Sequence, residues 1–244
     1  DSGLQTRLSF APGQETRAVW TPDGSAVVYS SLHEARHRIL LHPIEGNAVP
    51  RVLAESDQVL FPSSIHPSGE TLLVTMKGTE PAASDLDLGV LPLDGSSEPE
   101  VFLDLGEDLA GGGVFSPDGR WIAFNSTSEQ GFDVFVVSAD NPARKWQVTR
   151  TGSVWPEWSA DGSTLYTVAF GGDLLVTSVD GSGDTFRVGA TRTGIRSVVP
   201  TGDGRAFSLA PQGEFVFQSS PVSEGDASVS PLHLVTDWRR GLLR

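Results

Sequence analysis

Short runs of alternating apolar and polar residues fill most of this chain, and glycine-containing turns separate them. The clearest runs come directly after an Asp-Gly or Ser-Gly turn and span residues 26–29, 71–74, 121–124 and 164–167. A period of two residues is typical of β-strands, whose successive side chains point to opposite faces. Asp and Gly tolerate the positive φ angles that tight hairpin turns require. The pattern therefore predicts an all-β chain built from hairpins.

The turn that precedes these runs recurs along the chain at a nearly constant spacing. Its five copies end at Gly24, Gly69, Gly119, Gly162 and Gly204, which are 45, 50, 43 and 42 residues apart. A second turn follows each of the first four glycines after about 19–26 residues, with a strand-like run on either side of it. Each unit therefore holds four antiparallel strands in about 40–50 residues, which is the period of a β-propeller blade.

We predict one β-propeller domain of five four-stranded antiparallel blades. Six blades are the alternative, if residues 211–231 contain a further degenerate unit. The predicted blades are residues 15–54, 58–105, 110–150, 153–190 and 195–244, the last of them completed by residues 4–10. Residues 4–10 read as a strand with no partner before them, and the last unit lacks a clear fourth strand. Pairing between them would close the ring and remove exposed sheet edges.

The repeat also carries a family resemblance. The segments TPDGSAVVYS, SPDGRWIAFNS and SADGSTLYTVAF resemble the WD40-like PD40 repeat of TolB-like propellers, and the resemblance covers nearly the whole chain. VFSPDGRWIAFNSTSEQGFDVFVVS, KWQVTRTGSVWPEWSADGSTLY and LHLVTDWRRGL, in that order, resemble the carboxy-terminal propeller of bacterial membrane-anchored Ser/Thr kinases and related exported proteins. The resemblance implies a non-catalytic sensor or scaffold domain, periplasmic or otherwise extracytoplasmic. Because the chain begins at Asp1 rather than Met, we expect a mature form or part of a longer protein.

Charge and cysteine content narrow the classes of partner. Lys and Arg number 17 and Asp and Glu number 31, so the formal net charge of the 244 residues is −14. Such an acidic chain repels nucleic-acid phosphates and anionic membrane surfaces, so we expect no nucleic-acid binding. The sequence has no run of 18 apolar residues, so we expect no direct membrane insertion. We expect a monomer that binds a protein or peptide partner, or a small polar ligand. The absence of cysteine excludes disulfides and thiolate metal sites.

Residues 33–37 contain the zinc-protease pattern H-E-x-x-H. In that pattern two histidines one helical turn apart bind zinc, and the glutamate activates water. Here strand-like runs flank the motif, and the roughly six residues between them are too few for a stable helix. We interpret the motif as a polar loop between strands. We therefore expect no catalytic residue, no metal and no cofactor.

A propeller gathers two kinds of loop on one face, the loops between blades and those between the second and third strands of a blade. Loops on a rigid scaffold often carry binding residues, so we expect a ligand site there, at the mouth of the channel. The predicted binding residues are Glu15, Arg17, His33, Glu34, Asp57, Glu107, Asp108, Trp155 and Arg196. This mixture of acids, arginines and one tryptophan suits a polar or peptide-like ligand. The alternative is a metal-dependent hydrolase or lactonase-type enzyme whose site lies at the channel mouth.

Three aromatic residues, Trp20, Phe115 and Trp158, hold equivalent positions just before the repeated turn. We expect them to fill the core between neighbouring blades, because a repeated position has a repeated environment. Trp155 lies where the chain enters an inner strand. The alternative to a core position is that its indole is exposed and stacks on a ligand.

Overall fold

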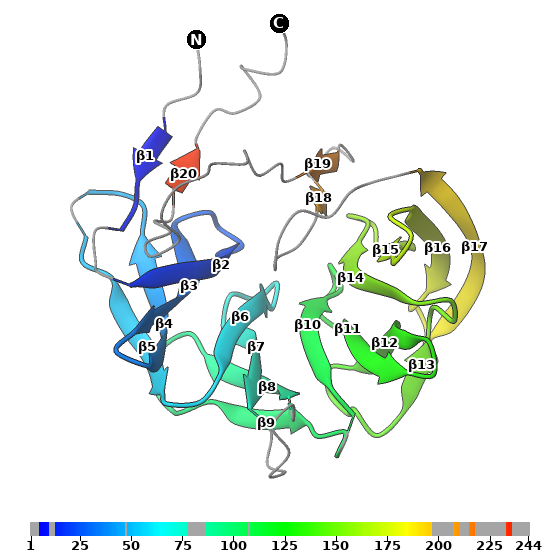
Figure 1. Ribbon diagram of the computed structural model, residues 1–244, viewed down its shortest axis with the longest axis horizontal. Coiled ribbons are helices and arrows are strands. Elements are labelled where there is room, and N and C mark those ends of the chain that lie inside the picture. The colour runs from blue at the N-terminus through cyan, green and yellow to red at the C-terminus, as the bar shows by residue number, and fades with distance from the viewer. Residues whose placement is uncertain are drawn as a thin grey trace, which may run out of the picture.

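The computed structural model arranges antiparallel sheets side by side around a common axis (Figure 1). The residues that the structure describes are 5–9, 13–46, 48–77, 86–106, 108–196, 207–209, 215–217 and 233–235. All regular structure among them is β-strand, which confirms the predicted all-β class. No helix in this part of the chain has the length and apolarity to span a membrane.

Four sheets contain four strands each, in sequence order, with the first strand nearest the axis. Blade 1 consists of β2 (Gln14–Trp20), β3 (Ala26–His33), β4 (Arg36–Pro43) and β5 (Arg51–Ser56). Blade 2 consists of β6 (Leu60–Ile65), β7 (Thr71–Lys77), β8 (Leu86–Pro92) and β9 (Glu100–Leu103). Blade 3 consists of β10 (Ala110–Phe115), β11 (Trp121–Ser128), β12 (Gly131–Ser138) and β13 (Lys145–Gln147). Blade 4 consists of β14 (Ser153–Trp158), β15 (Thr164–Ala169), β16 (Leu174–Asp180) and β17 (Arg187–Ile195).

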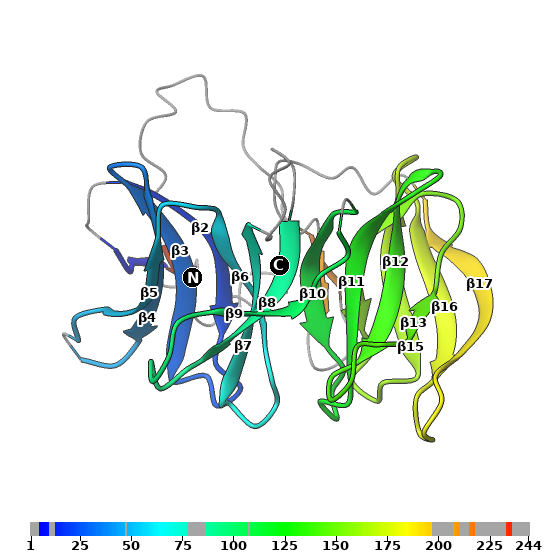
Figure 2. The same ribbon diagram turned by 90° about the horizontal axis from the view of Figure 1, so that it is seen from below.

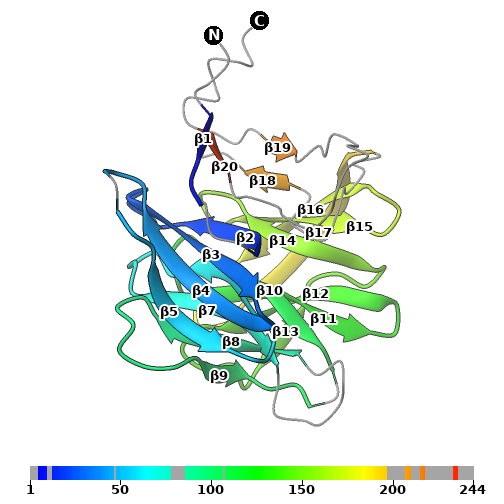
Figure 3. The same ribbon diagram turned by 60° about the vertical axis from the view of Figure 1, so that its left-hand side comes forward.

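The other described strands form two short antiparallel pairs. β1 (Gln5–Arg7) pairs with β20 (His233–Val235), and β18 (Phe207–Leu209) pairs with β19 (Phe215–Phe217), as Figure 3 shows. The amino-terminal segment therefore lies against the carboxy-terminal run. The predicted ring closure requires such a pairing, and closure itself stays a prediction.

The repeated turn is stabilised by its own side chains. In blade 4 the Ser159 hydroxyl donates to Asp161 Oδ1 (2.6 Å), which also accepts the Ser163 N–H (3.0 Å). Gly162 between them has a φ of 70°, a conformation that glycine adopts without steric cost. Blades 1 and 3 repeat the hydroxyl–aspartate bond of this turn, at Thr21–Asp23 and Ser116–Asp118. Local hydrogen bonding therefore explains why the sequence motif recurs.

The hydrophobic core lies mainly between neighbouring blades. Trp158 of β14 is 7% exposed, packs edge-on to Phe186 and donates its indole N–H to the Val114 carbonyl of blade 3 (3.2 Å). Phe115 is partly buried against the cluster between blades 2 and 3. Trp20 differs from both, because 47% of it is exposed. The core prediction is therefore wrong for Trp20, since β14 packs on three strands of the preceding blade and, within the described residues, β2 has no comparable cover on that side.

Candidate functional site

The four innermost strands, β2, β6, β10 and β14, surround the axis of the propeller (Figure 1). Each changes register against its neighbour at an equivalent point of the repeat, between Thr16/Val19, Pro62/Ser64, Gly111/Val114 and Val154/Glu157. A β-bulge of this kind inserts an extra residue and re-aims the side chain there. Each inner strand therefore has one extra residue, at the bulge, whose side chain does not follow the regular alternation of a strand.

Three of these bulges place a residue at positive φ. The angles are 54° for Arg17, 63° for Gly112 and 58° for Trp155. The left-handed conformation costs a residue with a Cβ atom about 1–2 kcal/mol, whereas glycine takes it freely. Blade 3 therefore has an unstrained glycine at this position, whereas blades 1 and 4 have residues with side chains whose backbone is strained. Such strain often marks functional positions.

Arg17 is exposed, and its guanidinium carbon lies 4.9 Å from the centre of the Phe61 ring in the next blade. This is a cation–π contact, and it joins the inner strands of blades 1 and 2. Glu15, two residues earlier in β2, is buried and accepts a hydrogen bond from the Ser9 hydroxyl. Burial and then the Glu15 charge raise the pKa of buried Tyr29 to about 12. Glu15 therefore lies within the packed blade, whereas Arg17 reaches solvent.

Trp155 is half-buried and packs beside Val168, Leu174 and Phe207. Its backbone N–H donates to Asn125 Oδ1 of blade 3 (2.9 Å). In the preceding pair of blades, Gly112 N–H donates to Thr75 Oγ1 in the same way (3.1 Å). The bulge thus anchors each inner strand to the blade before it, and much of the Trp155 indole serves the core.

The two kinds of loop do meet on one face. The Thr127 hydroxyl at the end of β11 donates to Asp108 Oδ1 (2.7 Å) in the loop between blades 2 and 3. In the next blade the Phe170 N–H donates to the Gly152 carbonyl (3.2 Å). Phe170 is 58% exposed there and is followed by two glycines. Sequence reasoning missed Phe170, although an aromatic residue before Gly-Gly in such a loop was a usable signal.

The H-E-x-x-H motif forms a hairpin, which confirms that it is not a helix, and only Glu34 and Ala35 lie outside the two strands. β3 ends at His33 and β4 begins at Arg36, and the turn residues Glu34 and Ala35 have φ angles of 50° and 61°. His33 Nε2 lies 3.7 Å from Glu34 Oε1. His37 pairs with Leu32, its ring stands edge-on to Phe61 of blade 2, and burial lowers its pKa. Across the described ranges, no three His, Asp or Glu side chains are grouped to hold a metal ion.

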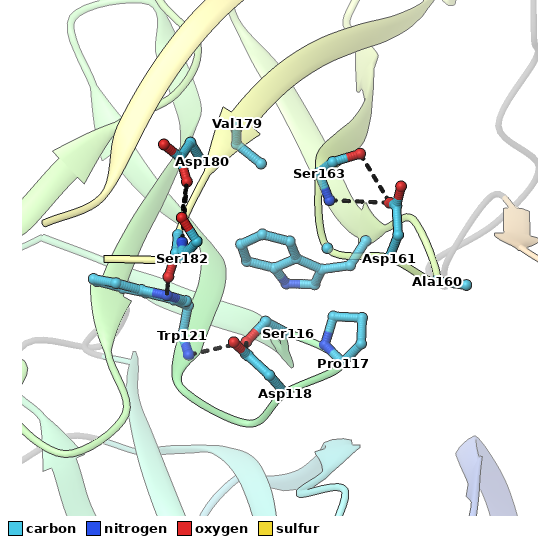
Figure 4. A pocket seen from close by; sticks show the side chains of 13 residues that line it. Ser116, Pro117, Asp118, Trp121, Ala160, Asp161, Ser163, Val179, Asp180 and Ser182 are labelled. Atoms are coloured by element: carbon cyan, nitrogen blue, oxygen red, sulfur yellow. Dashed lines mark hydrogen bonds between the residues drawn. The ribbon is translucent and has the colours of Figure 1, made fainter. Parts of the chain in front are cut away.

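A hollow of about 390 Å³ lies on the opposite face, between the repeated turns of blades 3 and 4 (Figure 4). Three carboxylates line it, those of Asp118, Asp161 and Asp180. Each accepts hydrogen bonds inside its own turn, and the Ser159 hydroxyl is the main cause that lowers the Asp161 pKa to about 2. The Ser182 hydroxyl likewise lowers the Asp180 pKa. Hydrogen bonding within the turns therefore explains why these three aspartates are present at the hollow.

Comparison with known proteins places this geometry among solved propellers. TolB from Acinetobacter baumannii superposes with a TM-score of 0.60 at 19% identity, over 82% of this chain and 47% of that one. A putative TolB from Agrobacterium tumefaciens gives 0.53 at 18% identity, over 85% and 90%. The fold is that of a TolB-like β-propeller. A gluconolactonase from Xanthomonas campestris shares the propeller fold as well, with a TM-score of 0.60 at 14% identity over 87% and 72%.

Sequence comparison adds one distant relative of the propeller. No protein-family model matches this chain. An uncharacterized protein of Agrobacterium fabrum is 25% identical over 130 residues, which are 51% of this chain and 44% of that protein. The propeller thus spans less than half the length of this curated relative.

The remaining predicted residues are spread from the channel to the rim of the propeller. Asp57 is exposed in the loop between blades 1 and 2, where it approaches the face that carries Asp108. Arg196 is exposed directly after β17, the outermost strand of blade 4. Glu107 lies outside the described residues. The structure therefore places Arg17 on an inner strand beside Phe61, and Arg196 directly after the outer strand of blade 4.

Proposed function

We propose that this propeller is a non-catalytic module that binds a protein or peptide segment, or a small polar ligand, on the face where the loops meet. The observation that carries the proposal is Arg17, an exposed cation held at positive φ in an inner-strand bulge. Glycine fills the equivalent place in blade 3 without strain, so the fold does not require a side chain there. A strained and exposed side chain indicates selection for its chemistry.

The chemistry around Arg17 suits a polypeptide. The guanidinium lies over Phe61 close to the axis, and the same face presents the aromatic ring of Phe170 and the carboxylate of Asp108. Arginine and aromatic side chains dominate the binding energy of protein interfaces, and carboxylates select for basic groups. The TolB-like fold supports a sensor or scaffold role within a longer protein. We place that protein outside the cytoplasm on the strength of the resemblance.

A peptide selection tests the module directly. Random peptides displayed on phage are selected on the immobilised propeller, and the enriched peptides are measured by fluorescence anisotropy against Arg17→Gly. We expect affinity to fall by about tenfold or more, because a cationic anchor is lost, while the fold is relieved of strain and stays intact. Arg144→Ala, at an exposed arginine beside Trp146 near the start of β13, is the matched control. Equal affinity of wild type and Arg17→Gly would contradict the proposal.

The likeness to a gluconolactonase favours a second candidate, a metal-dependent hydrolase or lactonase with its site at the channel mouth. Metal content by plasma mass spectrometry, melting before and after chelation, and hydrolysis of glucono-lactone separate the two. The binding module predicts no stoichiometric metal, an unchanged melt and no turnover. A bound metal whose removal abolishes lactone hydrolysis would establish the enzyme instead.

A further inference from the structure

The outer strand of blade 4 differs from the other outer strands. β17 has nine residues, and every one of them is exposed. The outer strands β5, β9 and β13 have six, four and three residues and bury part of their length. Figures 1 and 2 show β17 at the far edge of the molecule. Blade 4 therefore extends a long strand into solvent that contributes little to the core.

The free edge of β17 is open to pairing. In the sheet order β14-β15-β16-β17 one edge of β17 pairs with β16, and no described strand lies along the other edge. An unpaired edge exposes backbone N–H and C=O groups, which proteins usually protect with short strands, lysine or proline. β17 is long and contains neither lysine nor proline, and Gly189, Ala190 and Gly194 leave little side-chain bulk along it, although two register shifts against β16 make the strand irregular.

The charge on this edge has the opposite sign to the rest of the molecule. Arg187, Arg192 and Arg196 lie in or directly after β17, whereas the whole chain has a net charge of −14. Arg187 Nη1 pairs with Asp180 Oδ2 (3.1 Å). Arg192 and Arg196 make no ion pair with the described residues, and both are exposed. A register shift against β16 between Thr193 and Ile195 separates the two residues, so Arg192 lies within the strand and Arg196 in the bend that follows it.

We propose that β17 is a docking edge for an acidic, extended segment of a partner protein, which adds to blade 4 as a fifth strand. Backbone hydrogen bonds supply the affinity of such strand addition, and side chains supply the specificity. Acidic residues of the segment meet Arg192 and Arg196. A second copy of this chain fits less well, because antiparallel pairing about Thr191 sets the two Arg192 side chains diagonally on one face, where like charges repel. Arg196, in the loop after β17, borders the loop face, whereas Arg192 lies within the strand.

Labelled synthetic peptides test the docking edge. The probe is a nine-residue peptide of alternating Glu and Val, matched to the length of β17. Its controls have Lys in place of Glu, or a central proline that removes a backbone donor. We expect the acidic peptide to bind, to lose about tenfold or more in affinity with Arg192→Glu, and to protect amides 187–195 from hydrogen exchange. Arg150→Glu, at another exposed arginine, should change affinity less than about twofold.

Four results would overturn the proposal. They are no binding of the acidic peptide, equal binding of the proline peptide, equal affinity of Arg192→Glu, or a wild-type dimer that Arg192→Glu dissociates in sedimentation. Because Arg192 is exposed and unpaired among the described residues, Arg192→Glu should melt with the wild type, so that lost binding reports on docking. Arg17→Gly should leave this binding unchanged, which separates a failure here from a failure of the loop-face site.

Discussion

Single aspartates of the repeated turn carry a measurable electrostatic role. The Thr21 hydroxyl is the main cause that lowers the Asp23 pKa to about 2, and the Ser159 hydroxyl does the same for Asp161. The unfolded chain titrates near 3.8 at these groups, so the folded state favours the ionised carboxylate. Their stabilising contribution is complete above the unfolded value and is lost as the pH falls through the folded value.

Replacement of one of these aspartates tests the predicted direction in which stability changes with pH. Asp161→Asn should lower the melting temperature at pH 7, because the ionised acceptor of the Ser159 and Ser163 donors is lost. The difference from wild type should shrink between about pH 4 and pH 2, as the wild-type carboxylate is protonated. Thermal unfolding followed by circular dichroism measures it. Asp57→Asn, at an exposed loop position, should melt like the wild type at pH 7, and a pH-independent difference for Asp161→Asn would contradict the argument.

At the scale of elements, a charged side chain near the start of the third strand bonds to the segment of chain that follows that strand. Asp133 of β12 is buried and accepts hydrogen bonds from the Thr149 hydroxyl (2.8 Å) and the Gly152 N–H (3.2 Å), which lead into blade 4. Asp87 of β8 accepts the Leu105 N–H at the same point of blade 2 (3.4 Å). Blade 1 has Arg38 there, and it pairs with Glu55 of β5. An ion pair in blade 1 thus replaces the buried aspartate that blades 2 and 3 have at this position.

The hairpin between β3 and β4 offers a test of backbone strain. Ala35→Gly should raise stability by up to about 1 kcal/mol, since relief of the left-handed strain exceeds the entropy that glycine adds to the unfolded chain. Urea denaturation measures the change. Ala54→Gly, at a buried position of β5 without positive φ, should lower stability. A lower urea midpoint for Ala35→Gly than for the wild type would contradict the argument that left-handed strain at Ala35 reduces the stability of the folded protein.

At the scale of the whole molecule, the pairing of β1 with β20 joins the two ends of the chain. The paired residues are far apart in the sequence, and loss of the pairing would leave both β1 and β20 without their partner strand. At β17, in contrast, no described strand pairs with the outer edge of a long strand on an acidic protein. The pairing of the two ends is what ring closure requires, and closure itself stays a prediction.

Removal of the amino-terminal strand tests the predicted closure. Deletion of residues 1–10 should lower the stability of the domain by several kcal/mol, because the β1–β20 pairing and its apolar contacts are lost. Deletion of residues 1–3, which precede β1, is the control and should leave the melt unchanged. An equal melting temperature for the longer deletion and the full chain would show that closure by this strand is wrong.

The sequence alone determined the class of fold. Alternating apolar residues and Asp-Gly turns are local signals, because the turn hydrogen bonds of Asp23 and Asp161 join residues two apart. The same locality correctly excluded a helix at residues 33–37, although the structure reduces the predicted loop to the two turn residues Glu34 and Ala35. Equivalent repeat positions also predicted the burial of Trp158 correctly.

Tertiary structure decided what repeat positions alone do not contain. Trp20 and Trp158 are equivalent in sequence, yet Trp158 is covered by the preceding blade and Trp20 has no such cover from the described strands. The strain at Arg17 and the solvent exposure of Phe170 and β17 likewise depend on which segments pack alongside them. Burial and backbone strain arise from contacts between residues far apart in the chain, whereas hairpin turns arise within a few residues. For that reason the repeat revealed the blades, and only their assembly revealed the binding surfaces proposed for them.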